Sequence, residues 1–303
     1  PEEPAALKLA IELGRKEKAD VVMANDPDAD RLGIAVPGKD DSYILVSGNQ
    51  LGSLHLDYIL HSLSELGRMP PKPYCIKTVV TTNLQAAIAE KYGVECRECL
   101  TGFKWIADLM RQFEAQGKDF IYATEESYGH LIEPEVRDKD GISAAALTAE
   151  MTLYWRSKGL SLLDRLEKLY QEFGYHEERG ISKYFQGPQG MKIMSGIMDA
   201  YRAKQPIALG GIPVVSIRDI KTGFEWETGN PGKRKIDLPE SDVLQWRLRD
   251  GTLVTVRPSG TEHKIKYYIL CKADVPAAGL EKAKAQTREK IQAIEADIRK
   301  VIG

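Results

Sequence analysis

Three acidic residues alternate with other residues in the segment DPDADR at positions 26–31. In an extended chain such carboxylates share one face but span roughly 13 Å, because each residue advances about 3.3 Å. If the segment curls into a loop, Asp26, Asp28 and Asp30 offer three hard oxygen ligands of the kind that suits Mg²⁺. We therefore predict a magnesium loop here, with a solvated acidic turn as the alternative.

Two other interpretations of this segment can be tested on the sequence. A calcium-binding EF-hand loop needs glycine at its sixth position and glutamate at its twelfth, where this chain has Arg31 and Pro37. The EF-hand interpretation is therefore excluded. A metal-dependent phosphatase that uses Asp26 or Asp28 as its nucleophile, directly after the apolar run at 19–24, stays open.

The segment RPSGT at residues 257–261 lies between two predicted strands. Arg257 can donate charge-assisted hydrogen bonds to a phosphate, Ser259 and Thr261 can donate through their hydroxyls, and Gly260 lets the backbone approach closely. Proline, serine and glycine are also common in hairpins. The segment thus predicts a phosphate loop, with an ordinary turn as the alternative.

The segment TEESYGH at residues 124–130 follows an apolar run that is predicted to be a strand. Side chains at the carboxyl end of such a strand lie where α/β sheets usually bind ligands. Glu125 and Ser127 are therefore candidates for hydrogen bonds to sugar hydroxyls, with an exposed polar turn as the alternative. His130 is a candidate for proton transfer, although a lone histidine is more often structural.

Two further segments carry charge at predicted helix starts. Thr101, Gly102 and Lys104 precede or begin a helix, and the segment RDKDG at 137–141 precedes another and contains Lys139. Threonine and aspartate are also common helix caps. By themselves these segments are compatible with a substrate-binding role and with simple capping.

The elements around these segments change in type along the chain. Predicted strands at 76–80, 94–99 and 119–123 alternate with predicted helices at 83–93 and 103–117, which indicates an α/β layer with a largely parallel sheet. Beyond Gly174 most segments are predicted strands that follow each other with turn signals between them. That pattern predicts a boundary near Gly174 and an α+β domain with an antiparallel sheet.

Composition excludes several classes of protein. The 303 residues are 43% hydrophobic and 28% charged, which is typical of a folded globular chain. With 42 Lys and Arg against 44 Asp and Glu, the net charge of -2 argues against a nucleic-acid partner. No apolar run reaches the roughly 20 residues of a membrane span. We expect a cytoplasmic protein whose four cysteines, Cys75, Cys96, Cys99 and Cys271, are reduced thiols.

Taken in order, the five segments resemble those of the α-D-phosphohexomutase superfamily, which includes phosphoglucomutases and phosphomannomutases. The resemblance covers essentially the whole chain. It implies that residues 1–46 are the end of the second mutase domain with the metal loop, 47–173 the sugar-binding third domain, and 174–303 the phosphate-binding fourth domain. The implied fold is a three-layer α/β/α domain with a mixed sheet, followed by an α+β domain with an antiparallel sheet.

The resemblance also implies a reaction. Phosphoryl transfer between O1 and O6 of a hexose phosphate would proceed through an enzyme phosphoserine and a bisphosphosugar, with glucose 1,6-bisphosphate as activator and Mg²⁺ as cofactor. The residues implied for the transfer are Asp26, Asp28 and Asp30 as metal ligands, Arg31 beside the transferred group, and Lys139 and His130 for proton transfer or charge stabilisation. The residues implied for substrate binding are Thr101, Gly102, Lys104, Glu125, Ser127, Arg257, Ser259, Gly260 and Thr261.

One part of the family pattern is missing. The serine loop of the family contains a Ser-His dipeptide, and this sequence contains none. We therefore expect a C-terminal fragment that needs the N-terminal domains of the same protein and is inactive alone. The EESYG and RDKDG forms favour phosphoglucomutase over a phosphomannomutase or a dual-specificity enzyme. A noncatalytic sugar-phosphate-binding module stays open beside the phosphatase.

Overall fold

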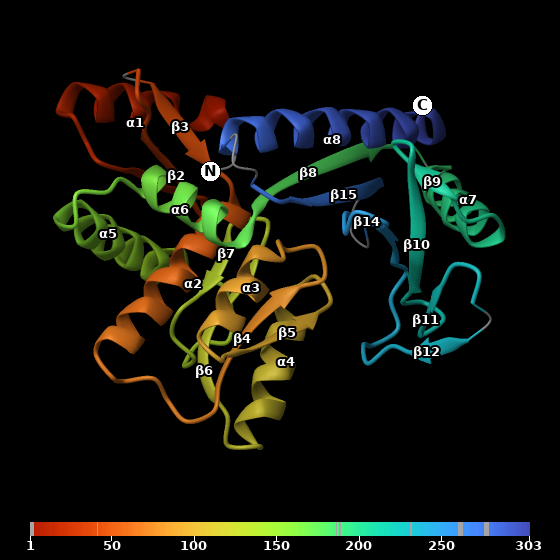
Figure 1. Cartoon of the computed structure of the whole chain (residues 1–303), viewed down its shortest axis with the longest axis horizontal. Coiled ribbons are helices and arrows are strands. Elements are labelled where there is room, and N and C mark those ends of the chain that lie inside the picture. The colour runs from red at the N-terminus through yellow and green to blue at the C-terminus, as the bar shows by residue number, and fades with distance from the viewer. Residues whose placement is uncertain are drawn as a thin grey trace. The chain divides into compact units, whose positions relative to one another are not determined.

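The computed structural model describes residues 3–40, 42–185, 187, 189–230, 232–259, 263–275 and 279–303. The chain divides into two units, Pro1–Phe173 and Gly174–Gly303, and each unit has its own sheets and core. Figure 1 labels most elements of both units.

Unit 1 begins with a small antiparallel sheet. Its elements are α1 (Pro4–Glu17), β1 (Val22–Asn25), β2 (Leu32–Pro37) and β3 (Tyr43–Val46), and the strand order is β1-β2-β3. Only residues 22–24 of the apolar run at 19–24 lie in a strand, and β3 was not among the predicted strands. Helix α1 packs against β1 and β3, and its buried Gly14 lies close to Val22 of β1 and Tyr43 of β3. The acidic segment at 26–31 is the connection between two antiparallel strands, β1 and β2.

The rest of unit 1 is an α/β layer. Its strands are β4 (Pro73–Thr78), β5 (Glu95–Cys99), β6 (Asp119–Glu125) and β7 (Gly129–Leu131), in the order β5-β4-β6-β7. Its helices are α2 (Gly48–Glu65), α3 (Leu84–Lys91), α4 (Phe103–Glu114), α5 (Gly141–Ser157) and α6 (Leu162–Phe173). Strand β4 is parallel to β5 and β6, whereas β7 is antiparallel to β6. The predicted α/β fold with a mixed sheet is confirmed.

Helices cover both faces of this sheet (Figure 1). Helix α4 buries Phe103, Ile106, Met110 and Phe113 against one face, because these residues recur at helical spacing. Helices α2 and α3 contact the other face, and α5 and α6 pack on α2. Because α2 is covered on two sides, its buried residues extend around most of its circumference. A capping box between Ser47 and Gln50 fixes the point at which α2 begins.

In its described residues, unit 2 contains one antiparallel sheet and two helices. Its elements are β8 (Tyr175–Tyr184), α7 (Gly190–Ala203), β9 (Ala208–Leu209), β10 (Ile212–Asp219), β11 (Phe224–Glu227), β12 (Lys233–Lys235), β13 (Leu244–Leu248), β14 (Leu253–Pro258), β15 (Lys264–Ala273) and α8 (Leu280–Ile302). The order is β12-β11-β10-β13-β14-β15-β8, with β9 paired to β10. The predicted antiparallel α+β domain is confirmed, and β8 begins directly after Gly174.

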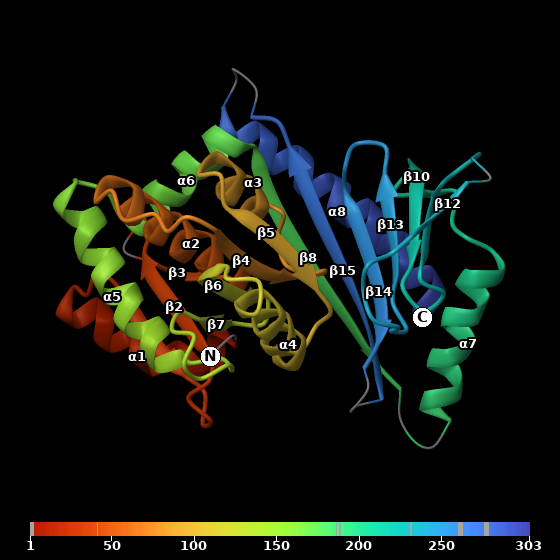
Figure 2. The ribbon, with the colours of Figure 1, turned by 90° about the horizontal axis from the view of Figure 1, so that it is seen from below.

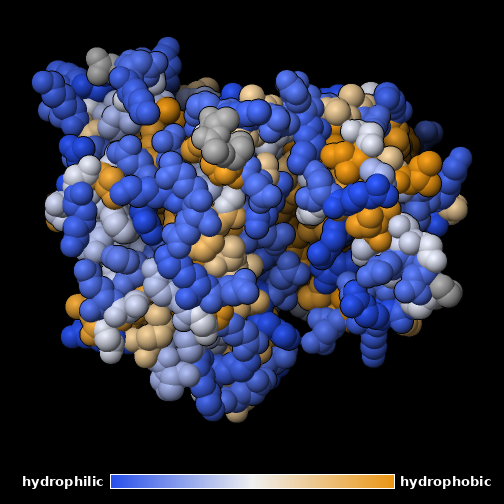
Figure 3. Space-filling model, viewed as in Figure 1, coloured by the Kyte–Doolittle hydropathy of each residue, from blue (hydrophilic) through white to orange (hydrophobic). Residues whose placement is uncertain are grey.

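The core of unit 2 lies between its sheet and its helices. Helix α8 lies along β8 and β15, and α7 contacts β14 and β15 (Figure 2). Alternate residues of the strands, among them Trp246, Val254 and Tyr267, point toward Ile294 of α8 and Met198 of α7. Figure 3 shows one face of the surface, where hydrophilic residues predominate and hydrophobic residues fill smaller areas. Across the described segments, none of the helices is both long and apolar enough to cross a membrane.

Candidate functional site

The segment between β1 and β2 curls back on itself. One carboxylate oxygen of Asp26, Oδ1, accepts hydrogen bonds from the backbone N–H groups of Asp30, at 3.2 Å, and Arg31, at 3.1 Å. The Ala29 N–H donates to the Asp26 carbonyl at 2.9 Å, and Ala29 has a φ of 56°, in the left-handed region. The Asp26 carboxylate therefore closes the loop, and this closure brings Asp30 close to Asp26.

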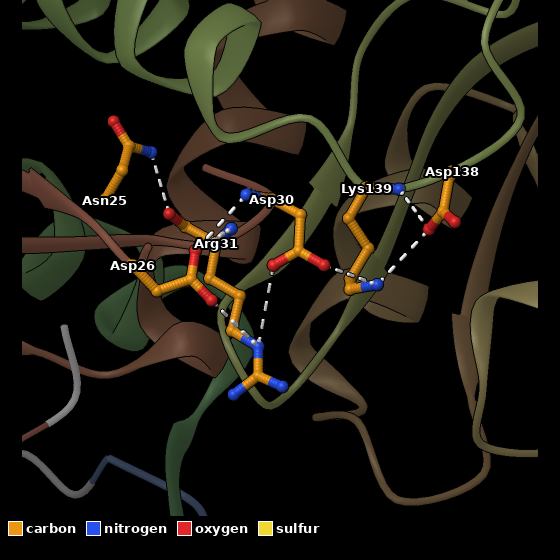
Figure 4. A network of polar contacts seen from close by, with 6 residues as sticks. All are labelled: Asn25, Asp26, Asp30, Arg31, Asp138 and Lys139. Atoms are coloured by element: carbon orange, nitrogen blue, oxygen red, sulfur yellow. Dashed lines mark hydrogen bonds and ion pairs between the residues drawn. The ribbon is translucent and has the colours of Figure 1, made fainter. Parts of the chain in front are cut away.

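Two cations lie among the carboxylates of this loop (Figure 4). Arg31 Nε is 3.7 Å from Asp26 Oδ2 and 3.9 Å from Asp30 Oδ1. Lys139, from the segment before α5, places its Nζ 2.9 Å from Asp30 Oδ2 and 3.2 Å from Asp138 Oδ1. The sequence segments at 26–31 and 137–141 therefore meet in one charged cluster.

The surroundings of Asp26 and Lys139 favour the charged form of each. Burial opposes the charge of Asp26, but hydrogen bonds from the Arg31 and Asp30 backbones and the nearby Arg31 guanidinium lower its pKa. Partial burial likewise opposes the charge of Lys139, but its hydrogen bonds to Asp30 and Asp138 raise its pKa. At neutral pH, Lys139 is therefore an ammonium group and a poor base.

The three carboxylates do not form a ready metal cluster. Among the residues that the structure describes, no group of three or more His, Cys, Asp or Glu side chains is arranged to hold a metal ion. Asp28 is exposed, and one oxygen of Asp30 is bonded to Lys139. The predicted convergence of Asp26, Asp28 and Asp30 is therefore not present in this arrangement. Their chemistry still suits a hard cation, since Asp30 Oδ1 is buried and accepts no hydrogen bond.

Backbone contacts join the loop at 26–31 to two other segments. Arg31 pairs with Gly129 in an isolated antiparallel bridge, and the Leu32 N–H donates to the Tyr128 carbonyl at 3.1 Å. The Gly141 N–H donates to the Ala29 carbonyl at 3.1 Å. The predicted metal, sugar and RDKDG segments thus share one edge of unit 1, although up to about a hundred residues separate them in sequence.

The turn after β6 is held from several directions. Glu125, which is only 8% exposed, accepts a hydrogen bond of 2.5 Å at Oε1 from the Gly102 N–H. This bond brings the segment at 101–104 to the same edge. The Thr124 hydroxyl donates to the Gly129 carbonyl at 3.0 Å across the turn. At the start of α2, a Cβ on Gly48 would lie 2.2 Å from the Glu126 carbonyl oxygen, so only glycine fits.

Other predicted substrate-binding residues of unit 1 differ in accessibility. Ser127 and Thr101 are half-buried at this edge, and Lys104 is exposed, with its Nζ 5.0 Å from the centre of the Trp105 ring. Gly102 has a φ of 112°, which explains a glycine immediately before α4. Ser127 and Lys104 can therefore reach a ligand, whereas Glu125 already serves as a buried acceptor.

His130 does not lie at the surface. It is fully buried on β7, where its Nδ1 shares a 2.6 Å hydrogen bond with the Tyr122 hydroxyl and lies 3.3 Å from the Thr124 hydroxyl. The His55 ring packs on it at 5.0 Å between ring centres. Burial lowers the pKa of His130 to about 3. We therefore correct the prediction of proton transfer by His130, because a group enclosed in the core cannot contact substrate.

This burial predicts a pH dependence of stability. In the unfolded chain His130 binds a proton near pH 6.5, whereas in the folded chain it does so only near pH 3. The stability of the folded state is therefore retained above pH 6.5 and is lost as the pH falls from 6.5 toward 3. Near the middle of this window we expect a slope of about 1.4 kcal/mol per pH unit from this imidazole. Burial also lowers the pKa of His55, which adds to the effect.

Urea unfolding of unit 1 measured at several pH values tests this. His130→Gln should reduce the slope by about one proton, and the exposed His263 of unit 2 provides a matched control as His263→Gln. An unchanged slope in His130→Gln would contradict the assignment.

The phosphate segment lies in unit 2, at the end of β14. Arg257 is opposite Lys266 in the register of β14 and β15, and the Ser259 N–H donates to the Lys264 carbonyl at 2.8 Å. Arg257 and Ser259 are both half-buried. Gly260 and Thr261 lie outside the described residues. The part that is described is a hairpin end with several cationic residues close in register.

Sequence reasoning missed several residues that shape the site. Asn25 donates from Nδ2 to the Arg31 carbonyl at 2.7 Å and so closes the loop on its other side. Asp140 accepts a hydrogen bond from the Ile142 N–H and caps α5, and its own N–H donates to the His130 carbonyl. The position of Asn25 directly before the acidic segment was the available signal. For Gly48 no signal exists in the sequence, because its constraint comes from a distant carbonyl.

Comparisons with known proteins agree with the resemblance. Residues 47–173 match the family model for phosphoglucomutase/phosphomannomutase, alpha/beta/alpha domain III, and residues 1–39 match the model for domain II. A phosphoglucomutase of Staphylococcus aureus (strain MRSA252) is 37% identical over 272 residues, which is 90% of this chain and 48% of that protein. The chain spans about half the length of the curated relatives it matches.

Solved structures with similar folds include two relatives. A putative phosphomannomutase from Thermus thermophilus has a TM-score of 0.61 at 16% identity, covering 99% of this chain and 50% of that one. The open form of pp63/parafusin, a phosphoglucomutase from Paramecium, has a TM-score of 0.60 at 17% identity, covering 97% and 47%. At these identities the likeness establishes the fold alone.

Proposed function

The chain belongs to the α-D-phosphohexomutase superfamily, and from this premise we propose that it provides the metal, sugar and phosphate segments of an enzyme that interconverts hexose 1-phosphate and hexose 6-phosphate. Such an enzyme is an isomerase that transfers a phosphoryl group. In the family pattern the transfer uses an enzyme phosphoserine and a bisphosphosugar intermediate. We further propose that the serine is supplied by a segment other than these 303 residues, which contain no Ser-His dipeptide.

The proposal rests on one observation, which is that Arg31 and Lys139 lie within ion-pair distance of the Asp26 and Asp30 carboxylates. A phosphoryl group in transfer carries negative charge on its peripheral oxygens, and preorganised cations stabilise that charge. Arginine is always protonated, and the raised pKa of Lys139 keeps it protonated as well, since its bonds to Asp30 and Asp138 outweigh its burial. We assign charge stabilisation to both residues and no proton abstraction to Lys139.

We propose Asp26, Asp28 and Asp30 as the residues that would hold Mg²⁺. The ion would supply charge neutralisation at the transferred phosphoryl group. Support comes from the pKa of Asp26, which the Arg31 and Asp30 backbone hydrogen bonds lower against an opposing burial effect. Further support comes from Asp30 Oδ1, which is buried and accepts no hydrogen bond, although Arg31 Nε lies 3.9 Å away. Because Asp28 is exposed and Asp30 bonds to Lys139, binding requires the three side chains to rearrange.

Substrate binding is assigned to segments of both units. In unit 1, we assign contacts with the sugar hydroxyls to Ser127 and to Glu125, whose Oε1 accepts from the Gly102 N–H, with Thr101, Gly102 and Lys104 beside them. In unit 2, the non-reacting phosphate is assigned to Arg257, Ser259, Gly260 and Thr261.

For the sugar, we propose a phosphoglucomutase-type preference. The support is the phosphoglucomutase relative at 37% identity and the EESYG and RDKDG forms of the sequence. Phosphomannomutase or dual activity is the runner-up, since glucose and mannose differ only in the stereochemistry at C2. Competition between glucose 1-phosphate and mannose 1-phosphate on the assembled enzyme distinguishes the two preferences.

The test of function compares the chain alone with the same chain joined to a phosphoserine-bearing segment of a relative. With Mg²⁺ and glucose 1,6-bisphosphate, we expect the chain alone to give no glucose 6-phosphate from glucose 1-phosphate and the joined protein to give it. The coupled assay with glucose-6-phosphate dehydrogenase reads the product. Mutase turnover by the chain alone would overturn the proposed dependence on a separate serine. Release of free phosphate with a trapped aspartyl phosphate would instead indicate a phosphatase.

A further inference from the structure

We propose that Cys75 and Cys96 form a redox-active dithiol that a hydroperoxide oxidises to an intramolecular disulfide. The pair lies in the sheet of unit 1, on strands β4 and β5. Neither cysteine is among the residues assigned to the mutase reaction.

The backbone brings the two cysteines opposite each other. Cys75 of β4 is the direct register partner of Cys96 of β5. Neighbouring strands lie about 4.8 Å apart, which falls within the roughly 4.4 to 6.8 Å between Cα atoms in disulfides. Both side chains leave the sheet on the face opposite Tyr74 and Ile76, which pack with α4. A cross-link therefore needs side-chain rotation and little movement of the backbone.

The two thiols differ in access to solvent. Cys75 is 2% exposed, whereas Cys96 is only partly buried. Lys77 and Glu98 are the next register partners on the same face of β4 and β5, and Lys77 Nζ lies 2.8 Å from Glu98 Oε1. A cation therefore lies two residues along β4 from Cys75. An oxidant can therefore reach the Cys96 thiol first. Cys75 is then the resolving thiol, which reacts with the oxidised Cys96.

Hydrogen bonding divides the roles in the same way. Hydrogen bonding with the Cys75 thiol, together with the charge of Lys77, lowers the pKa of Cys96 against the opposing effects of burial and of the Glu98 carboxylate. The same bond, with burial, raises the pKa of Cys75. Since the thiolate is the nucleophile, Cys96 is the thiol that reacts with an oxidant.

The proposed oxidation of the two thiols to a disulfide consumes one equivalent of peroxide. The Cys96 thiolate attacks one peroxide oxygen, the O–O bond breaks, and the leaving hydroxide takes up the proton that Cys96 released, which leaves a sulfenic acid. The Cys75 sulfur then bonds to the Cys96 sulfur, and the hydroxyl leaves with the Cys75 proton as water. Two thiols lose two electrons, and hydrogen peroxide is reduced to two waters.

The other two cysteines serve as internal controls. Cys99 is buried on the α4 face, and burial raises its pKa to about 12. Cys271 is buried in the core of unit 2, and burial raises its pKa to about 11. Buried thiols of raised pKa react slowly with peroxide. The sequence contains four cysteines in all, so the expected oxidised form retains two thiols.

The experiment treats the folded chain with hydrogen peroxide, then alkylates it under denaturing conditions without reductant. We expect a form that has lost two of its four alkylatable thiols, with a peptide cross-linked between Cys75 and Cys96, and full recovery after dithiothreitol. Cys96→Ser and Cys75→Ser should each abolish the cross-link, whereas Cys99→Ser should leave it unchanged. Hydrogen exchange of β4 and β5 verifies that each variant is folded.

Three results would overturn the proposal. These are oxidation of Cys96 to sulfinic acid with Cys75 still reduced, a cross-link that includes Cys99 or Cys271, and cross-linking only between two copies of the chain. Cys75→Ser supplies a separate check, since it should let the sulfenic acid at Cys96 accumulate and react with dimedone. If Cys96 in that variant gives no dimedone adduct and no higher oxide, it is not the reactive thiol.

Discussion

In the enzyme assembled with its phosphoserine segment, Lys139→Met is expected to lower kcat by roughly 100- to 1000-fold, the usual effect of removing one preorganised charge-stabilising group. The Nζ of Lys139 bonds to Asp30 and Asp138, so its charge is held in place before substrate arrives. The expected loss falls on kcat more than on KM, since negative charge at the transferred group is greatest in the transition state.

Two further variants separate charge stabilisation from proton abstraction. Lys139→Arg keeps the positive charge and should retain part of the activity. Its pH profile between about pH 7 and 9 should be unchanged, because the carboxylate partners of Lys139 raise its pKa above the usual 10.5 despite burial. If Lys139→Arg were as inactive as Lys139→Met while the fold persisted, a base role would replace the one assigned here. The exposed Lys158, as Lys158→Met, is the matched control.

The largest effect on stability is expected from Arg165→Met. Arg165 of α6 donates to the Asp57 carboxylate of α2 through Nε at 2.7 Å and Nη2 at 2.6 Å. The Asp57 side chain is only 1% exposed, so the variant leaves an uncompensated buried charge. We expect unit 1 to lose about 3 to 5 kcal/mol of unfolding free energy.

The measurement is urea unfolding followed by hydrogen exchange in peptides of α2 and α6, which restricts the readout to unit 1. Lys91→Met is the control, because Lys91 and Glu172 form an ion pair in which both side chains are 40% exposed. Its expected cost is about 0 to 1 kcal/mol. Adding Asp57→Leu to Arg165→Met should recover part of the loss, since no buried charge then remains. Equal losses in Arg165→Met and Lys91→Met would contradict the argument.

Much of the fold follows from local patterns in the sequence. The alternation of apolar runs with helical periodicity predicts the α/β layer, and consecutive strands after Gly174 predict the antiparallel sheet. Strands such as β12 (Lys233–Lys235) were not predicted, because all three of its residues are exposed and only pairing with β11 defines it. Strand β8 runs from Tyr175 to Tyr184 because these residues pair with β15 along its whole length.

The segments that carry charge were also evident from the sequence, but their mutual arrangement was not. Residue types identify Asp26, Asp30 and Lys139 as candidates. Only the folded chain brings Lys139 Nζ to Asp30 Oδ2, because Arg31 pairs with Gly129 and Gly141 donates to Ala29. These are contacts between distant positions, which no local periodicity encodes.

Burial determined the role of His130, which its residue type alone could not. His130 has the chemistry of a proton-transfer group, yet β7 places its imidazole in the core, and the Gly102 N–H already occupies one oxygen of Glu125, the proposed sugar ligand. The sequence by itself determined the family, the order of the segments and the class of each element, because these depend on residue type and near neighbours. Tertiary structure decided which side chains are charged, buried or adjacent, because these depend on packing between segments far apart in the chain.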